Sequence, residues 1–411
     1  MAYFSKIQIQ YRRLSNLTAL PLLMCCIYSH AEIQIKNHPI NSVVAKYQAQ
    51  DIPISSAKKI NNMRIMHIDL DYVYDSDIQQ QQKNIQTLVA RIQYLQPNTI
   101  FLQAFADPDA NGSADQVYFE NRHLPNRNNL FPKLVHEIRQ QTQVEQIYAW
   151  LPLIAWELPK SKMLQYVEHS QGSTQGYIRL SPFDAKNINI VAEIFSDFIK
   201  NNPVDGILYH DDITLSDYED SSVIAKKMYD TWGFQDQNML SHANHSQQFS
   251  FAKYKTAYLD QFAAGISNIL KKQQPNLLTA RNMYASVVLN YKSEQWFSQS
   301  LSSTFRYYDY NAIMAMPYME ESTNHHQFYL DLIIQAKKYD PNLDRTIFEL
   351  QTINWKDNSK ISSQEIAETM HFLEQQGVKH LGYYPDDFVE QHPHASMLKS
   401  VFSSEHLDHK H

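Results

Sequence analysis

The chain has 411 residues, 43% of them hydrophobic, which is enough for one large globular domain or two ordinary ones. Its 36 basic and 43 acidic residues give a net charge of −7 without a basic stripe. This balance argues against a nucleic-acid partner and favours a neutral or cationic one.

The N-terminal segment, residues 1–31, is predicted to be a secretory signal peptide. Basic residues up to Arg13 precede a short apolar stretch at 17–28, and Ala31 closes a small-x-small cleavage site. We therefore expect a periplasmic or secreted protein; an uncleaved signal that anchors the chain to the membrane is the alternative. Both cysteines, Cys25 and Cys26, lie in this segment, so the mature chain should have no disulfide and no Cys nucleophile.

Residues 32–62 are polar and lack periodicity, which indicates a linker or a loosely ordered arm. From 63 to 403, short apolar runs alternate with amphipathic helical patterns, as in a parallel α/β fold. The expected strands are 64–72, 99–106, 146–154, 205–211, 278–284, 310–317, 346–352 and 380–385. A helical pattern follows each of the first seven, and a weaker one lies near 395–402, before a polar tail at 404–411.

Eight such units predict an α/β fold of the (β/α)8 TIM-barrel type with long βα loops. An open doubly wound sheet is the alternative, but the chain has only 8 glycines and no glycine-rich phosphate loop. In a barrel, the carboxyl ends of all strands surround one mouth, where active sites are found. Polar residues cluster at those predicted ends, including Gln103, Asn282 and Gln351.

The segment Tyr209-His210-Asp211-Asp212 is the strongest candidate for chemistry, because its carboxylates directly follow an apolar strand. Crowding and partial burial raise the pKa of at least one such carboxyl, which can then act as a general acid. Glycoside hydrolysis needs this acid and a second group at the anomeric carbon. The acidic stretch that follows, from Asp217 to Asp220, fits a binding role or an ordinary solvated loop equally well.

Two glutamates and one polar stack are candidates for the remaining parts of the site. Glu320 follows the end of the sixth strand, at the mouth, and Glu349 lies within the seventh, where it could point into the barrel; each is either a partner carboxylate or a structural hydrogen-bond acceptor. His67, Asp69 and Asp71 alternate along the first strand, so they should share one face. That stack suits a site floor or a buried ion-pair network; zinc is a further alternative, but we predict no metal and no cofactor.

Aromatic residues near the strand ends could bind a ligand through their flat apolar faces. A cationic amino sugar would add a cation–π attraction. Trp296 and Trp355 fall shortly after strand ends and favour a site role, whereas Trp150 and Trp156 fit a site or the core equally well. Further candidates near the mouth are Tyr177, Tyr318, Tyr383 and Tyr384.

Eight segments, in order along the chain, resemble one known family. They are MHIDLDYVYD (66–75), LQAFADPD (102–109), RLSPFD (179–184), GILYHDDITLSDYED (206–220), TARN (279–282), AIMAMPYME (312–320), ELQTINW (349–355) and GYYPDDF (382–388). Together they resemble the C-terminal glycoside-hydrolase-like barrel of periplasmic poly-β-1,6-N-acetyl-D-glucosamine N-deacetylases of biofilm systems. The resemblance covers residues 64–388.

The resemblance implies endo-acting hydrolysis of partly de-N-acetylated poly-β-1,6-N-acetyl-D-glucosamine in an electronegative groove. It carries the family's glucosamine contacts onto Asp211, Asp212 and Asp217, and a family glutamate onto Glu320. It carries aromatic sugar contacts onto Tyr177, Trp296 and Trp355. We expect Asp211 to be the general acid and Glu320 its partner, with Asp212 beside them; participation of the substrate's own acetamido group is an alternative.

One departure from the family concerns its N-terminal, metal-dependent deacetylase domain. Only about 60 residues precede the barrel, and no Asp-His-His metal motif is found there, so we expect no deacetylase activity. The resemblance implies two partners, a separate deacetylase and an outer-membrane export porin. A non-catalytic module that binds the polysaccharide during export is the alternative to an enzyme.

Overall fold

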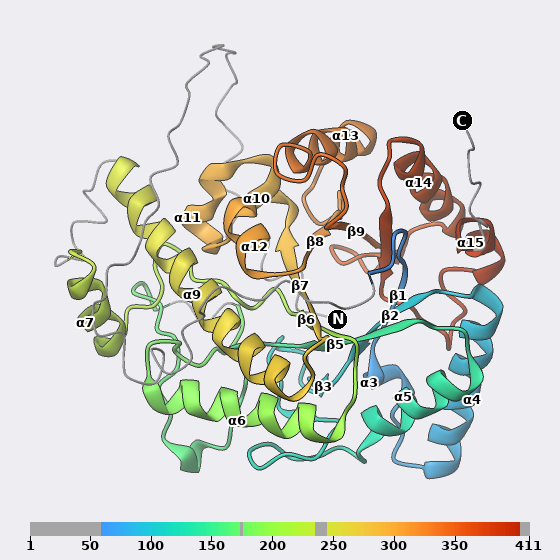
Figure 1. Ribbon diagram of the computed structural model, residues 1–411, viewed down its shortest axis with the longest axis horizontal. Coiled ribbons are helices and arrows are strands. Elements are labelled where there is room, and N and C mark those ends of the chain that lie inside the picture. The colour runs from blue at the N-terminus through green and yellow to red at the C-terminus, as the bar shows by residue number, and fades with distance from the viewer. Residues whose placement is uncertain (1–58, 173–175, 235–244, 403–411) are drawn as a thin grey trace.

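The computed structural model describes residues 59–172, 176–234 and 245–402 (Figure 1). Eight parallel strands close into a barrel in the order β1-β12-β9-β8-β7-β6-β5-β2. Their bounds are β1 Arg64–Ile68, β2 Thr99–Gln103, β5 Gln146–Leu151, β6 Gly206–Tyr209, β7 Leu278–Tyr284, β8 Tyr310–Met314, β9 Thr346–Gln351 and β12 His380–Tyr384. The predicted (β/α)8 TIM barrel is confirmed.

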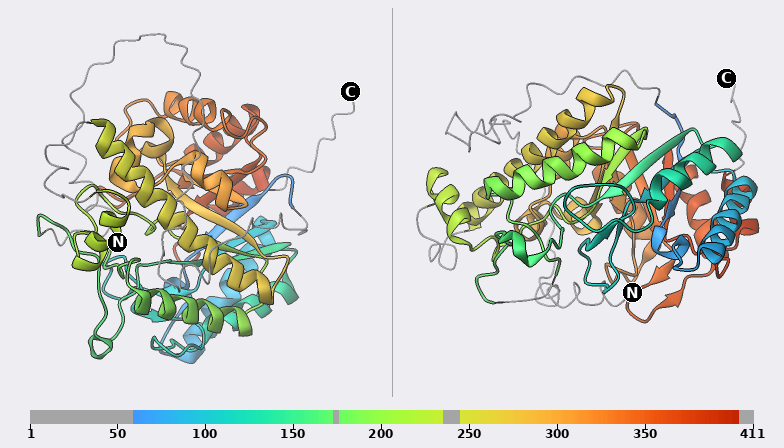
Figure 2. Two further views of the ribbon diagram at one scale, coloured as in Figure 1. Left: turned by 60° about the vertical axis from the view of Figure 1, so that its left-hand side comes forward. Right: turned by 90° about the horizontal axis from the view of Figure 1, so that it is seen from below.

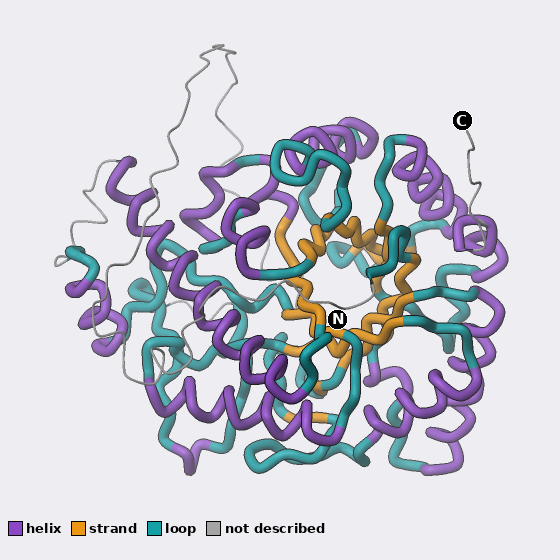
Figure 3. The backbone as a smooth tube through the Cα atoms, viewed as in Figure 1, coloured by secondary structure: helices purple, strands orange, loops and turns teal. Residues whose placement is uncertain are grey.

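Helices follow every strand of the barrel and surround it (Figure 3). They are α4 Ile78–Leu95, α5 Leu130–Gln141, α6 Ala185–Asn201, α7 Val223–Thr231, α9 His245–Gln273, α12 Leu301–Tyr307, α13 His325–Ala336, α14 Ser363–Gln375 and α15 Ala395–Phe402. Shorter helical turns are α3 Leu70–Val73, η2 Lys160–Lys162, α10 Ala285–Leu289, η3 Tyr291–Ser293 and α11 Glu294–Phe297. The helices α6 and α9 pack side by side on the outside of the barrel (Figure 2).

The amphipathic pattern of α4 illustrates how the sequence builds this outer layer. Asp77 caps its N-terminus by accepting a hydrogen bond from the Gln79 amide, and Ile85, Leu88 and Leu95 are buried against the strands. Because helices cover the outer face and side chains fill the inside, nearly every strand residue is buried, as expected for a parallel sheet.

A glycine makes room for a tyrosine inside the barrel. A Cβ atom added to Gly206 at the start of β6 would lie 2.2 Å from Cε1 of Tyr148 on the neighbouring strand. Real atoms cannot approach so closely, so the ring of Tyr148 occupies the space that a side chain at 206 would need. This contact helps to position β6, which leads directly into His210 and Asp211.

The first predicted strand is too long, and the prediction that His67, Asp69 and Asp71 share one strand face is wrong. The strand β1 ends at Ile68, Asp69 takes the N-cap position of α3, and Asp71 lies in the first turn of that helix. An acidic side chain is favourable there because it faces the positive end of the helix. The strict alternation of a strand therefore stops before Asp69.

Two short hairpins were not predicted as separate elements. The strand β3 (Phe105–Ala106) pairs with β4 (Gln116–Val117), and β10 (Ile353–Asn354) pairs with β11 (Ser359–Lys360). Both hairpins belong to loops that follow barrel strands, so they extend the same end of the barrel as the mouth. They account for part of the long βα loops expected from the sequence.

The predicted signal peptide at 1–31, most of the predicted linker and the tail at 404–411 lie outside the described residues. Among the residues that the structure describes, no helix combines the length and the apolar character needed to cross a membrane.

Candidate active site

The candidate site lies at the carboxyl ends of the strands, where the loops after β1, β5, β6, β7, β8, β9 and β12 meet. Asp211 is its most tightly held carboxylate and is only 3% exposed. Oδ1 accepts a hydrogen bond from the Tyr177 hydroxyl at 2.7 Å, and Oδ2 accepts a short one from the Tyr284 hydroxyl. Nδ1 of His210 lies 2.8 Å from Oδ1.

The surroundings of Asp211 favour its ionised form. Burial alone would raise the pKa of this carboxyl, but the charge of His210 and the hydrogen bonds from His210, Tyr284 and Tyr177 outweigh burial and lower it. The same pairing raises the pKa of His210 against the effect of its burial. Asp211 is therefore an anion near neutral pH, which is not the protonation state that the predicted acid role requires.

Glu320 has the opposite electrostatic character. Glu320 is half-buried after β8, and Oε1 accepts a hydrogen bond from the Ser286 amide at 3.1 Å. Desolvation raises the pKa of Glu320 to about 7, so an appreciable fraction stays protonated near neutral pH.

The junction between β7 and α10 links the two carboxyl groups. Tyr284 ends β7 and donates to Asp211, while Ser286, two residues later, donates its amide to Glu320. Asp211 and Glu320 therefore flank one short segment at the barrel mouth, one ionised and one close to half-protonated. Tyr284 was not singled out from the sequence, although it ends the predicted strand 278–284.

Asp212 is held in a different way from its neighbour. Its side chain is fully buried, Oδ1 accepts the Leu153 amide at 3.1 Å, and Oδ2 accepts the Ile154 and Ala155 amides at 2.6 and 2.7 Å. These bonds fasten the loop after β5 to the end of β6. This placement does not bring Asp212 to the open mouth beside Asp211 and Glu320.

The segment 177–181 fixes the acidic loop that follows Asp211. Its alternate side chains all reach that loop, as the period of an extended chain allows. Tyr177 binds Asp211, Arg179 pairs with Glu219 at 2.7 Å, and Ser181 donates to Asp220 at 2.6 Å. The carboxylates of Glu219 and Asp220 are therefore structural, whereas Asp217 at the tip of the loop is exposed.

The opposite side of the mouth holds a buried polar network. Glu349 on β9 is 1% exposed, accepts the Asn282 amide nitrogen at 2.7 Å and pairs closely with Nδ1 of His67. The ring of Trp150 packs edge-on against His67 and stacks on His210 with centroids 4.8 Å apart. Through Trp150, this network contacts the His210–Asp211 pair.

Asp69 and Asp71 have separate partners at this side. The Tyr384 hydroxyl lies 3.2 Å from Oδ2 of Asp69, and burial raises the pKa of Asp69 to about 8. Asp71 instead forms an ion pair with Arg127 at 3.0 Å and accepts the Tyr118 hydroxyl. Asp69 thus contacts Tyr384 at the mouth, whereas the charge of Asp71 is balanced by Arg127.

The aromatic candidates divide between the mouth and the core. Trp355 is buried and stacks on Tyr384 with centroids 6.2 Å apart, and Trp296 is half-buried on α11. Tyr318 donates its hydroxyl to Glu365 at 2.8 Å. Trp156 and Tyr383 are fully buried in the hydrophobic core, which makes them packing residues.

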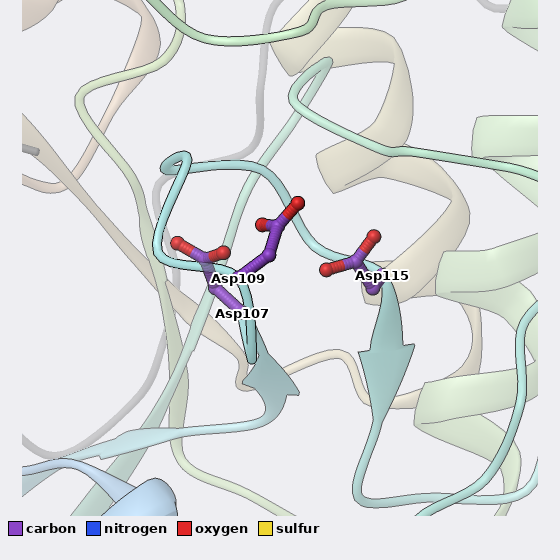
Figure 4. Close-up of side chains that lie close together, drawn as sticks. All are labelled: Asp107, Asp109 and Asp115. Carbon is purple, nitrogen blue, oxygen red and sulfur yellow. The ribbon is translucent and has the colours of Figure 1, made fainter.

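A group of three aspartates could hold a cation. Asp107, Asp109 and Asp115 in the loop between β3 and β4 point their carboxylates toward one another (Figure 4), with ligand oxygens within 4.8 Å. Carboxylate oxygens are ligands for hard cations such as Ca²⁺ or Mg²⁺. Burial raises the pKa of Asp107 to about 6 and that of Asp115 to about 7. This group did not emerge from the sequence.

Fold and site together define a (β/α)8 barrel of the glycoside hydrolase type, with two carboxyl groups on either side of the β7–α10 junction at its mouth. The family model described as hypothetical glycosyl hydrolase family 13 matches residues 67–384. The chain belongs to this family.

Similar proteins agree with this assignment. The poly-β-1,6-N-acetyl-D-glucosamine N-deacetylase of Escherichia coli strain K12 is 38% identical over 362 residues, which are 85% of this chain and 54% of that protein. The same values hold for its counterpart in Escherichia coli O157:H7. The chain thus spans about half the length of these curated relatives. The predicted resemblance is confirmed.

Solved structures with a similar three-dimensional fold support the same assignment. The glycoside hydrolase domain of PgaB (BpsB) from Bordetella bronchiseptica is 36% identical, with a TM-score of 0.79, and the match covers 84% of this chain and 99% of that one. A β-galactosidase from Rahnella sp. R3 has a TM-score of 0.58 at 11% identity over 85% of this chain and 57% of that one, which shows likeness of fold alone.

Proposed function

We propose that this protein is an endo-acting glycoside hydrolase that binds and cleaves partly de-N-acetylated poly-β-1,6-N-acetyl-D-glucosamine. The single observation that carries the proposal is the contrast between Asp211, which is ionised, and Glu320, which has a pKa of about 7. Both groups flank the Tyr284–Ser286 segment. Two carboxyl groups with separated pKa values are what glycoside hydrolysis uses as acid and anion.

The sequence led us to expect Asp211 as the general acid, but these pKa values favour Glu320 as the acid and Asp211 as the anion. Protonated Glu320 donates its proton to the glycosidic oxygen as the bond from that oxygen to the anomeric carbon breaks. The Asp211 carboxylate stabilises the positive charge that develops at the anomeric carbon, with Tyr177 and Tyr284 orienting it. Water then adds to that carbon, and the proton it releases restores the acid. Attack by Asp211, or by the acetamido oxygen of the substrate, is compatible with this assignment.

Other side chains at the mouth suit an amino sugar. Exposed Asp217 can pair with a glucosamine ammonium group, and the partly exposed Asp69 and Tyr384 offer a carboxyl beside an aromatic ring. The half-buried rings of Trp296 and Tyr318 offer further aromatic surface near the strand ends. The buried rings of Trp355 and Trp150 stack on Tyr384 and His210 and so support the mouth from beneath. In this proposal Glu349 shapes the site through His67 and Asn282, and Asp212 positions the loop after β5.

The test is incubation of the protein with the partly deacetylated polymer, followed by mass spectrometry of the products. We expect shorter oligosaccharides from the wild type and almost none from Asp211→Asn or Glu320→Gln. Glu368→Gln, an exposed carboxyl on α14, is the matched control and should retain activity. Intact polymer at every enzyme concentration would overturn the proposal.

A second candidate function is polysaccharide binding without cleavage, in support of export. The near-complete burial of Asp211 favours it, because a reacting carboxylate must reach the sugar. Binding of the polymer by the wild type, with no shortening of it, would establish this alternative. Deacetylation is named for the relatives, of whose length the chain covers only 54%, and it forms no part of this proposal. A periplasmic location, with a separate deacetylase and an outer-membrane porin as partners, completes the proposed setting.

A further inference from the structure

The loop after β6 leads from Asp211 into an irregular segment, residues 213–216, whose backbone carbonyl groups all accept hydrogen bonds from side chains. The four donors come from four parts of the chain: Arg281 on β7 binds Ile213, Arg179 binds Thr214, Ser298 at the end of α11 binds Leu215, and Lys255 on α9 binds Ser216. Buried carbonyl groups outside helices and sheets need partners of this kind. Three of these donors are cations, so the backbone that follows Asp211 is held by charge-assisted hydrogen bonds.

The strand β7 holds both the side chain of Asp211 and the backbone that follows it. The Tyr284 hydroxyl donates a hydrogen bond to Oδ2 of Asp211. Three residues earlier on the same strand, Nη2 of Arg281 donates to the Ile213 carbonyl at 2.7 Å. Arg281 is fully buried, so its guanidinium serves this contact and does not reach a ligand in the mouth.

The extended segment 177–181 repeats this arrangement. The Tyr177 hydroxyl donates to Oδ1 of Asp211 at 2.7 Å. Two residues later, Nη1 of Arg179 donates to the Thr214 carbonyl. Each oxygen of the Asp211 carboxylate therefore has its own tyrosine donor, and each tyrosine is accompanied by an arginine of the same element that holds the backbone just after Asp211.

Buried carboxylates hold both guanidinium groups in place. Arg281 forms a close ion pair with Asp260 on α9, which is also fully buried and accepts the Tyr308 hydroxyl at 3.1 Å. Arg179 pairs with Glu219 at 2.7 Å. Burying such ion pairs contributes little net stability, because the cost of removing the charges from water offsets their attraction. A planar guanidinium that is fixed on one side presents its remaining donors in a defined direction, so these pairs are suited to setting geometry.

We propose that Arg281 and Arg179 are positioning residues for Asp211. They fix the backbone that follows it and thereby keep its carboxylate against the two tyrosine hydroxyls. Neither arginine reaches the substrate, because both are buried, so each acts through Asp211. A displacement of about 1 Å at a reacting group can lower a rate by about 10²-fold, so this support matters for catalysis. The inference rests on the proposed function, because it concerns the carboxylate that stabilises the anomeric carbon there.

The experiment replaces each arginine together with its carboxylate partner, so that no charge is left buried without a partner and the net charge stays the same. The two variants are Arg281→Met with Asp260→Asn and Arg179→Met with Glu219→Gln. The first readout is the titration of the Asp211 carboxyl, followed by NMR of isotope-labelled aspartate carboxyl carbons and assigned by its loss in Asp211→Asn. We expect the pKa of Asp211 to rise in both variants, because the carboxylate loses its alignment with the hydroxyls that favour its ionised form.

Two further measurements separate this role from a general effect on the fold. In a Tyr177→Phe/Tyr284→Phe background, the same substitutions should not move the titration further, since the hydroxyls through which the arginines act are gone. In cleavage of the polymer, kcat should fall by about 10- to 100-fold while KM stays near its wild-type value.

The matched control is a second buried arginine–aspartate pair. Nε of Arg91 donates to Asp386 at 2.9 Å, and Nη2 of Arg91 donates to the Pro393 carbonyl at 2.6 Å. This pair also holds backbone, but it joins α4 to the segment after β12. Arg91→Met with Asp386→Asn should therefore leave the titration of Asp211 at its wild-type position.

The outcomes separate this inference from the proposed function. An Asp211 titration that stays at its wild-type position in both variants would overturn the positioning role, whatever happens to cleavage. A shift of the same size in the Tyr177→Phe/Tyr284→Phe background would also overturn it, because the shift would then bypass the hydroxyls. If the titration moves as expected but wild-type protein leaves the polymer intact, the proposed function fails and the positioning of Asp211 stands. Should one variant fail to fold, as judged by urea denaturation, the other variant decides.

Discussion

The Tyr177 hydroxyl donates a hydrogen bond to Oδ1 of Asp211 at 2.7 Å, across a buried site at the mouth of the barrel. The two residues come from different loops, and their contact aligns the segment 177–181 with the acidic loop after β6. It also helps to keep the Asp211 carboxylate ionised despite its burial.

Replacing Tyr177 by Phe removes this donor and should raise the pKa of Asp211. Hydrogen bonds to charged groups contribute about 1.5–3 kcal/mol, so kcat/KM should fall by about 10- to 100-fold. Because the reaction needs ionised Asp211, the acidic limb of the pH–activity profile should also move to higher pH. The profile of kcat/KM checks both effects, and a uniform loss at all pH values would instead indicate a purely steric role.

Glu320 should set the alkaline limb of the pH profile. Its pKa is raised to about 7 by burial, and the proposed acid role requires the protonated form, so activity should decline as pH rises through about 7. Glu320→Gln should lower kcat by about 10²- to 10⁴-fold and abolish that limb in the residual activity. An unchanged alkaline limb in this variant would assign the acid to another group.

Asp212 should matter for stability because it accepts three backbone amides of the loop after β5. Asp212→Ala leaves these buried donors without acceptors, at a cost of about 1–3 kcal/mol for each unsatisfied group. We expect the free energy of unfolding, measured by urea denaturation, to fall by about 3 kcal/mol or more. Asp217→Ala is the control, since its exposed side chain should change stability by less than about 0.5 kcal/mol.

Gly206→Ala should destabilise the barrel from inside. The added methyl group would lie 2.2 Å from the Tyr148 ring, and overpacking of this kind typically costs about 1–3 kcal/mol. Combining it with Tyr148→Ala, which removes the clashing ring atoms, should restore part of the loss. Thermal denaturation of the two single variants and the double variant measures this coupling; strictly additive losses would show that the two positions do not interfere.

Much of the barrel could be predicted from the sequence, because buried parallel strands are continuous apolar runs separated by amphipathic helices. The fifth predicted strand, 278–284, coincides with β7. The first strand was predicted too long because Asp69 and Asp71 continue the alternation of β1, although they belong to the start of α3. Pattern alone does not separate an alternating strand end from a helix N-terminus with acidic residues.

The position of Asp211 and Glu320 near strand ends could also be predicted, but their protonation could not. The pKa of Asp211 depends on its burial and on the neighbouring His210, and further on the hydroxyl groups of Tyr284 and Tyr177, which lie far from it in sequence. Likewise, the burial of Asp212 and its three amide partners follow from the packing of β5 against β6. Such contacts between distant segments appear only once the chain is folded.

The pH dependence of polymer cleavage, compared between the wild type and Glu320→Gln, decides whether Glu320 is the general acid. Wild-type protein should release oligosaccharides fastest on the acidic side of the pKa of Glu320, and Glu320→Gln should release few at any pH. Equal product release by both proteins across the pH range would contradict this assignment.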